Sequence, residues 1–245
     1  MREVNLLEPM INVVYPRRCP VCGDIVTPRG ELACSSCKKN LTPIQEPRCK
    51  KCSKPVESEE AEYCLDCFKK RHKYIKGFAL WLYDAGMKKS IADFKFHGRR
   101  EYGEFYVSEI VKRFEKEILD IAPDALIPIP IHRSKLLRRG YNQAEILAKG
   151  IGKELEIPVL SHLLLRNKNT LPQKQLNDKE RLKNLEQAFE FSEKEKERYN
   201  NHIHKVILID DIYTTGSTIE ACTNILIQNG INEIYFICVC IGKGY

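Results

Sequence analysis

The sequence predicts an α/β protein in which a mostly parallel sheet flanked by helices follows a small N-terminal metal-binding module. From residue 74 onward, short apolar runs alternate with segments of helical periodicity, which is typical of a parallel sheet. Before residue 73, eight of the 11 cysteines recur at regular spacing, which is typical of a zinc module. We therefore expect two domains in this chain of 245 residues, 1–72 and 73–245.

The composition is that of a globular protein with a moderate positive charge. The 40 Lys and Arg outnumber the 33 Asp and Glu, which gives a net charge of +7 and a pI near 8.8. This charge favours anionic partners without proving any, because it also serves solubility. No apolar run reaches the roughly 20 residues of a membrane-spanning helix, and the N-terminus lacks the features of a secretory signal. We expect a cytoplasmic protein that does not insert into membranes.

The N-terminal cysteines form four C-x-x-C pairs, and eleven residues separate each pair from the next. The pairs are Cys19 and Cys22, Cys34 and Cys37, Cys49 and Cys52, and Cys64 and Cys67. Four thiolates complete the tetrahedral site that zinc prefers, whereas disulfides, the alternative, rarely persist in a reducing compartment. We expect two structural zinc ions in a double zinc ribbon that unfolds on chelation. Pairing of the first pair with the second and the third with the fourth is favoured over an interleaved arrangement.

The first half of the larger domain is predicted to hold two strands and three helices. Residues 78–84 (FALWLYD) form an apolar run typical of a strand. Residues 87–96 and 104–119 repeat apolar side chains at three- and four-residue spacing, which predicts amphipathic helices. Residues 125–130 (ALIPIP) predict a short buried strand that enters a proline-bounded loop, and residues 142–155 predict the next helix.

The second half is predicted to continue the alternation. Residues 185–191 (LEQAFEF) alternate like a strand, and residues 206–209 (VILI) predict a strand buried on both faces. Residues 217–230 predict a helix that stops at Gly230, and residues 233–241 (EIYFICVCI) predict the last strand. In a sheet of this kind ligands bind where the strands end, so the residues after 209 are the first place to look for a site.

The stretch KVILIDDIYTTGSTIEA, residues 205–221, combines features that suit a sugar phosphate. The hydroxyl-rich loop would bind a phosphate through backbone N–H groups at a helix N-terminus; it consists of Thr214, Thr215, Gly216, Ser217 and Thr218. Asp210 and Asp211 would repel that phosphate, so they suit the two hydroxyls of a ribose or a bound Mg²⁺. The alternative is that the loop only caps the helix and the aspartates end the strand in solvent.

The segment VILIDDIYTTGST resembles the phosphoribosyl pyrophosphate (PRPP) signature of type I phosphoribosyltransferases, in which the paired acids contact the ribose hydroxyls and the loop binds the 5-phosphate. Residues 127–148, residues 166–184 and the four cysteine pairs extend the resemblance over nearly the whole chain. Together they resemble the ComF family of bacterial competence proteins, also called ComFC or GntX-like. The resemblance implies a type I phosphoribosyltransferase-like domain, after a double zinc ribbon, that binds PRPP with Mg²⁺.

The resemblance also implies roles for residues outside the signature. Asp210 and Asp211 would be the catalytic pair. The loop 130–133, with Ile131, His132 and Arg133, would hold the pyrophosphate. A basic cluster beside it could bind phosphate or be a solvated helix face; it consists of Arg133, Lys135, Arg138 and Arg139. The polar segment 166–181 matches the flexible loop that closes over PRPP and excludes water; its members are Arg166, Lys168, Gln173 and Arg181.

Three functions are compatible with the sequence. The first is a competence protein that binds PRPP and handles incoming single-stranded DNA, with a ComFA-type helicase ATPase and a DprA-type protein as the partners that the resemblance implies. The second is an active Mg²⁺-dependent phosphoribosyltransferase of nucleotide metabolism with an unidentified acceptor. The third is a zinc-ribbon adaptor that has lost its ligand, which the intact signature argues against. No segment specifies an acceptor, so binding is favoured over turnover.

The segment 95–106 (KFHGRREYGEFY) mixes basic and aromatic residues, which is the composition of a surface that stacks single-stranded nucleic acid. Its aromatic residues Phe105 and Tyr106, with Phe94 just before it, could equally belong to the core.

Overall fold

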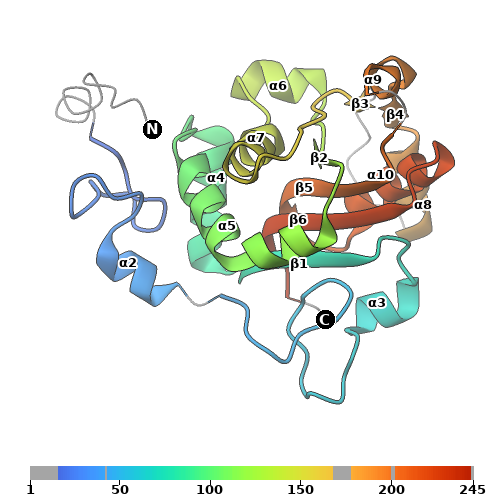
Figure 1. Ribbon diagram of the computed structural model, residues 1–245. Helices are drawn as coiled ribbons and strands as arrows, with labels where there is room; N and C mark the ends of the chain where they lie inside the picture. Colours follow the sequence, from blue (N-terminus) through green and yellow to red (C-terminus); the bar gives the residue numbers. More distant parts are fainter. Residues whose placement is uncertain (1–15, 42, 168–177, 200–201, 244–245) are drawn as a thin grey trace.

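The computed structural model describes residues 16–41, 43–167, 178–199 and 202–243. Its centre is a four-stranded parallel sheet in the order β1-β6-β5-β2 (Figure 1). The strands are β1 (Lys76–Leu82), β2 (Ala125–Pro128), β5 (Lys205–Tyr213) and β6 (Glu233–Ile241). The two central strands are apolar along most of their length because both faces of the sheet are covered.

Alternate residues of the central strands contribute to two separate hydrophobic clusters. Ile207 and Ile209 point to the face covered by three helices, α4 (Ala85–Phe96), α5 (Tyr102–Ile121) and α7 (Gln143–Leu155). Val206 and Leu208 point to the opposite face, which α10 (Ser217–Gln228) covers. Each strand residue therefore packs on one layer only, as the two-residue period of a strand requires. At the end of β5 the chain leaves the sheet and enters α10.

The N-terminal cysteines form two similar units, each with an isolated β-bridge followed by a short helix. The bridges are Arg18↔Ile25 and Arg48↔Pro55, and the helices are α2 (Ser35–Asn40) and α3 (Leu65–Lys70). Equivalent positions in the two units lie thirty residues apart. One structural repeat therefore contains two C-x-x-C pairs. We call these units the first ribbon, residues 17–40, and the second ribbon, residues 48–70.

The two ribbons lie against different layers of the sheet. Cys19 and Cys34 of the first ribbon belong to the cluster on the α4, α5 and α7 side, and Arg17 forms a 2.7 Å ion pair with Glu104 of α5. The four cysteines of the second ribbon belong to the cluster on the α10 side. In Figure 1, α2 accordingly lies beside α4 and α5, whereas α3 lies at the other end of the sheet.

The structure differs from the prediction at residues 185–191, where the predicted strand is wrong in its first half. Helix α8 (Asp178–Glu186) covers the start of that segment, and only β4 (Phe189–Phe191) is extended, paired antiparallel with β3 (Leu164–Arg166). Helix α9 (Glu193–Arg198) was not predicted, and α6 (Arg133–Arg139) was considered only as the alternative of a solvated helix face. Neither has a buried residue, so neither carries a hydrophobic period that a sequence pattern could reveal.

The three aromatic residues that were open between core and surface, Phe94, Phe105 and Tyr106, are all buried, so they are core residues. Among the described helices, none combines the length and the hydrophobicity that crossing a bilayer requires.

Candidate functional site

The two aspartates of the signature lie at the carboxyl end of β5, between β6 and β2. The strand continues through Tyr213, and Asp210 is paired in register with Cys238 of β6. The chain then turns through Gly216, whose φ of 79° lies in the left-handed region, and α10 begins at Ser217. A strand end, a glycine turn and a helix N-terminus thus follow one another within eight residues, which is the geometry that binds anions in parallel sheets.

The carboxylates are held close together in a partly closed environment. Asp211 is 6% exposed and forms an ion pair with Lys95 of α4, in which Nζ of Lys95 lies 2.7 Å from Oδ1 of Asp211. Burial, followed by the charge of Asp211, raises the pKa of Asp210 to about 7. A bound cation, or hydroxyl groups that donate hydrogen bonds, would stabilise the ionised form of both neighbouring carboxyl groups. This pair is therefore suited to a divalent metal ion or to the hydroxyls of a sugar.

A cleft of about 340 Å³ opens beside the aspartates, and four basic side chains, which we call the basic wall, also line it. The cations that line it are Lys95, Lys135, Arg139 and Arg166. Burial, and then the charges of Arg166 and Arg139, lower the pKa of Lys135. The Nε atom of Arg139 is buried and has no hydrogen-bond acceptor among the described residues. Crowded, partly desolvated cations of this kind favour an anionic ligand with several oxygen atoms.

A smaller hollow of about 50 Å³ lies inside the loop that follows β5. Residues 213–219 and Asp210 line it, and a 3.0 Å hydrogen bond joins the hydroxyls of Thr215 and Ser217. Asp210, Thr214 and Thr218 line both this hollow and the larger cleft, so the two adjoin. A ligand could therefore have one anionic group in the loop, a polar uncharged centre at the aspartates and a second anionic group in the basic cleft.

The other predicted ligand residues are distributed around the cleft. Ile131 lines it, whereas His132 caps α6 by accepting a hydrogen bond from the Ser134 amide, and Arg133 is exposed. Arg166, at the end of β3, lines the basic wall.

The rest of the predicted flexible loop is described only in part. Lys168 and Gln173 lie outside the described residues, and Arg181 lies in α8, with its side chain outside the described part.

Sequence reasoning missed the role of Lys95. It stands in the basic and aromatic segment that was considered for nucleic acid, and no local pattern connects it with Asp211, which is more than a hundred residues away. Only the packing of α4 across the end of the sheet brings the two side chains together.

A cleft of about 750 Å³ lies elsewhere, between α5, α7 and Leu32 of the first ribbon. Its charged side chains alternate in sign, with Glu104 and Lys112 from α5 and Lys153 and Glu154 from α7. This cleft has the volume of a ligand site but no cluster of like charges, so the smaller cleft at β5 is the better candidate.

The eight N-terminal cysteines form two groups, and the grouping is the sequential one. Cys19, Cys22, Cys34 and Cys37 form the first, and Cys49, Cys52, Cys64 and Cys67 form the second; within each, the sulfur atoms lie within 4.8 Å of one another. All 11 cysteines lie within the described residues, and all are free. A tetrahedron of Zn–S bonds of about 2.3 Å has edges of about 3.8 Å. The Sγ atoms of Cys52 and Cys64 are 3.7 Å apart, so the second group fits zinc.

The two groups differ in exposure, which predicts two rates of metal loss. In the first group Cys22 is exposed and Cys37 is half-buried, whereas all four cysteines of the second group are buried. Metal analysis should return two zinc ions per chain, and a strong chelator should remove one zinc quickly and the second slowly. A zinc content near zero in protein prepared without chelator would contradict the metal assignment.

Comparison with known proteins agrees with these observations. A family model described as a double zinc ribbon domain matches residues 10–68. The chain is 38% identical over 112 residues to competence protein F of Haemophilus influenzae, covering 46% of this chain and 48% of that protein. It is 31% identical over 155 residues to competence protein ComFC of Bacillus subtilis, covering 62% of this chain and 58% of that protein. The chain is therefore similar, over about half of its length or somewhat more, to two competence proteins.

A further relative is similar over a stretch of comparable length. DNA utilization protein YhgH of Escherichia coli K12 is 28% identical over 118 residues, 48% of this chain and 49% of that protein. The matched stretches thus span about half to three-fifths of the length of these relatives. Among solved structures, a purine phosphoribosyltransferase from Pyrococcus horikoshii Ot3 covers 56% of this chain and 86% of that chain at 15% identity, with a TM-score of 0.29. That likeness is too weak to support an inference.

Proposed function

We propose that this protein, which is similar to competence proteins of the ComF type, binds PRPP together with Mg²⁺. The observation that supports the proposal most directly is the order of chemical groups along two adjoining hollows. The loop 214–218 would hold the 5-phosphate, Asp210 and Asp211 would contact the ribose hydroxyls and the metal ion, and the basic wall would hold the pyrophosphate. The carboxylate pair fits Mg²⁺ because its oxygen atoms are the ligands that this ion prefers, and Mg²⁺ would offset the repulsion between the pyrophosphate and the two acids.

Calorimetric titration of the full chain tests the proposal. PRPP with Mg²⁺ should bind more tightly than ribose 5-phosphate, which lacks the pyrophosphate, and ribose 5-phosphate more tightly than ribose. Equal affinity for PRPP and ribose 5-phosphate would mean that the basic wall does not bind the pyrophosphate. Absence of binding by all three would overturn the proposal.

A second candidate function is phosphoribosyl transfer, in the glycosyltransferase class. The basic wall favours it, because Lys135 and Arg139 would stabilise charge on pyrophosphate as it leaves C1 of the ribose while an acceptor atom bonds to that carbon. Incubation with labelled PRPP, Mg²⁺ and a pool of nucleobases distinguishes the two functions. Pyrophosphate release that depends on an added base would establish transfer. If PRPP stays unchanged, the protein binds PRPP without transferring its phosphoribosyl group to these bases.

We further propose that the protein acts in the cytoplasmic handling of incoming single-stranded DNA, with a ComFA-type helicase ATPase and a DprA-type protein as partners. The relatives named for competence and for DNA utilization support this context. Residues 1–72 and 73–245 remain the proposed domains.

The surface best suited to DNA lies where α4 ends beside α6, next to the basic wall. Phe96 is 55% exposed, and the Arg139 guanidinium lies 4.7 Å from the centre of its ring. Further exposed arginines follow Phe96 in the chain or belong to α6; they are Arg99, Arg100, Arg133 and Arg138. An exposed aromatic ring among cations is the arrangement that stacks a base while the cations contact phosphates.

Substitutions on this surface should separate stacking from charge. Phe96→Ala should weaken binding of a single-stranded oligonucleotide about tenfold without changing its salt dependence, because it removes one stacked base. Arg138→Gln should lower the slope of log K against log salt by about one. Gel-shift series across salt concentrations measure both effects. Phe68→Ala is the matched control, since Phe68 is 74% exposed but lies on the second ribbon. If Phe68→Ala weakens oligonucleotide binding more than Phe96→Ala does, the DNA-binding surface lies on the zinc module instead.

A further inference from the structure

The second ribbon and the phosphate-binding loop share one hydrophobic cluster. Cys49, Cys52, Cys64 and Cys67 are buried in the same cluster as Tyr213, which precedes the loop, and Ile219, which follows it. The first ribbon packs in the other cluster, on the opposite face of the sheet. Of the two metal centres, only the second therefore lies in the layer that supports the loop.

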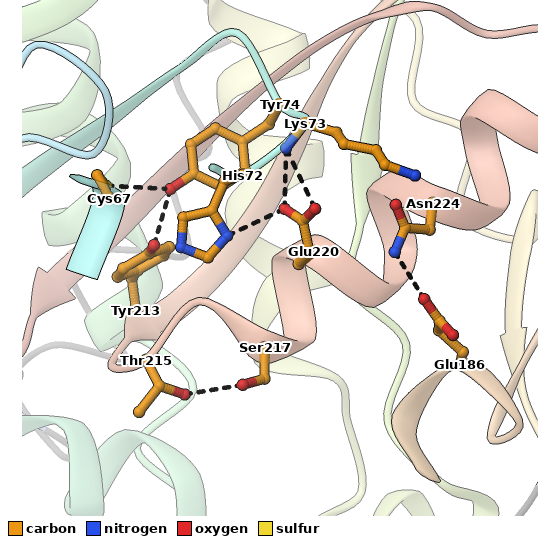
Figure 2. Close-up of polar contacts among 10 residues, drawn as sticks. All are labelled: Cys67, His72, Lys73, Tyr74, Glu186, Tyr213, Thr215, Ser217, Glu220 and Asn224. Carbon is orange, nitrogen blue, oxygen red and sulfur yellow. Dashed lines mark hydrogen bonds and ion pairs between the residues drawn. The ribbon is translucent and has the colours of Figure 1, made fainter. Parts of the chain in front are cut away.

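A short segment, residues 72–74, connects the second ribbon with the end of β5; we call it the strap. It follows α3, which carries Cys67, and precedes β1. The Tyr74 hydroxyl lies 2.8 Å from the Tyr213 hydroxyl and 3.9 Å from the Sγ of Cys67 (Figure 2). One hydroxyl thus contacts a ligand atom of the second metal centre and the residue directly before the loop.

The strap also holds the first turn of α10. The Glu220 carboxylate lies 3.1 Å from Nδ1 of His72 and accepts hydrogen bonds of 3.1 and 3.2 Å from the Lys73 backbone N–H (Figure 2). The His72 and Glu220 side chains are 3% and 10% exposed, so water competes little for these contacts. Because Glu220 lies one turn after Gly216, these bonds fix the end of the helix that presents the loop.

The glycine of the loop rests directly on the strap and its partner. A Cβ at Gly216 would lie 2.3 Å from the Tyr213 hydroxyl oxygen and 3.1 Å from Cε1 of His72. The rings of His72 and Tyr74 are stacked, with centroids 5.1 Å apart, so the surface under the loop is a packed unit. A shift of the strap would therefore move the backbone N–H groups of the loop.

We propose that the second zinc centre positions the phosphate-binding loop through the strap, and that the first zinc centre does not. The inference rests on the proposed function for the role of the loop. Zinc binding by four buried cysteines fixes α3 and hence the strap; without the ion, the ribbon loses the bonds that define it. Tyr74, Tyr213, His72 and Glu220 are then positioning residues, which act on the ligand through the loop.

Equivalent cysteines of the two ribbons provide a matched test. Cys34 and Cys64 occupy the same position in the repeat and are each 8% exposed. Each Cys→Ser variant of the full chain should lose one zinc. Cys64→Ser should raise the hydrogen-exchange rate of the amides at residues 214–218 by about tenfold or more, and it should weaken ribose 5-phosphate binding by about the same factor. Cys34→Ser should change the exchange rate and the affinity by less than about twofold. Equal effects of the two variants, or none at the loop, would overturn the inference.

Tyr74→Phe keeps the test decisive if Cys64→Ser does not fold. It retains the stacked ring and both zinc ions but removes the hydroxyl, so loop exchange should rise and affinity fall by about three- to tenfold. Unchanged loop exchange in this variant would contradict the inference. If the wild-type chain binds neither PRPP nor ribose 5-phosphate, the proposed function fails, while the exchange measurements still decide whether the second zinc centre holds the loop.

Discussion

Replacement of both aspartates, Asp210→Asn together with Asp211→Asn, is expected to abolish PRPP binding, with a loss of at least about a hundredfold in affinity. The change removes the negative charge that would hold Mg²⁺ and replaces acceptors for the ribose hydroxyls with amides that also donate. The fold and the zinc content should remain unchanged, because neither side chain contacts the metal centres and the asparagines keep the same shape. Calorimetry with PRPP and Mg²⁺ measures the effect, and metal analysis of the same sample checks the fold.

The control for this variant is Asp93→Asn. Asp93 lies in α4, three residues before Phe96, and forms ion pairs with Lys89 and His97 outside the cleft. Its replacement also removes a carboxylate from this side of the molecule, but it should leave PRPP affinity within about twofold. Equal affinity in the wild-type chain and the double variant would remove the aspartates from the ligand site.

The pH dependence of wild-type binding is a second arm of this test. Because burial and Asp211 raise the pKa of Asp210 to about 7, that carboxyl group is largely protonated below this value and ionised above it. Affinity for PRPP with Mg²⁺ should therefore increase as the pH rises from 6 to 8. In the single variant Asp210→Asn, only the ligand's own phosphates should still make the affinity depend on pH. If the affinity of this variant rises with pH as steeply as that of the wild-type chain, the role of Asp210 is contradicted.

The substitution Gly216→Ala is expected to produce the second large effect. Gly216 has a φ of 79°, where alanine is strained, and its Cβ would lie 2.3 Å from the Tyr213 hydroxyl oxygen. The loop must move to relieve this contact, and the N–H groups that would bind the phosphate move with it. Ribose 5-phosphate affinity should fall about ten- to a hundredfold, the range for losing one or more hydrogen bonds to a charged group. Calorimetry measures the affinity and thermal unfolding the stability.

Gly230→Ala separates the strain from the effect on the site. Gly230 has a similar φ of 84°, and the nearest atom to its Cβ would be Nζ of Lys196 at 3.8 Å. This variant should lose about 1–2 kcal/mol of stability from backbone strain and bind ribose 5-phosphate normally. Equal loss of affinity in the two variants would mean that general destabilisation, not the loop, is responsible.

Contiguous features of this protein were predictable from its sequence because local spacing encodes them. Cysteines two residues apart share a turn wherever the chain folds, so four C-x-x-C pairs predict zinc ribbons; the structure confirms the sequential grouping that was favoured over the interleaved one. The strands at β5 and β6 are apolar runs, and α10 has a helical period between Gly216 and Gly230. Asp210 and the loop after it lie within one strand-turn-helix unit, so their proximity needed no knowledge of tertiary structure.

Only the tertiary structure decided what stands opposite that unit. Lys95 reaches Asp211 because α4 crosses the end of the sheet, and Glu220 meets His72 because the second ribbon packs against α10. The placement of the two ribbons on opposite faces was equally hidden, since their sequences repeat but their surroundings do not. These contacts join residues more than a hundred positions apart and are set by how the helices and ribbons cover the two faces of the sheet. Local periodicity contains no information about such pairs, whereas the burial of apolar surface on each face fixes them.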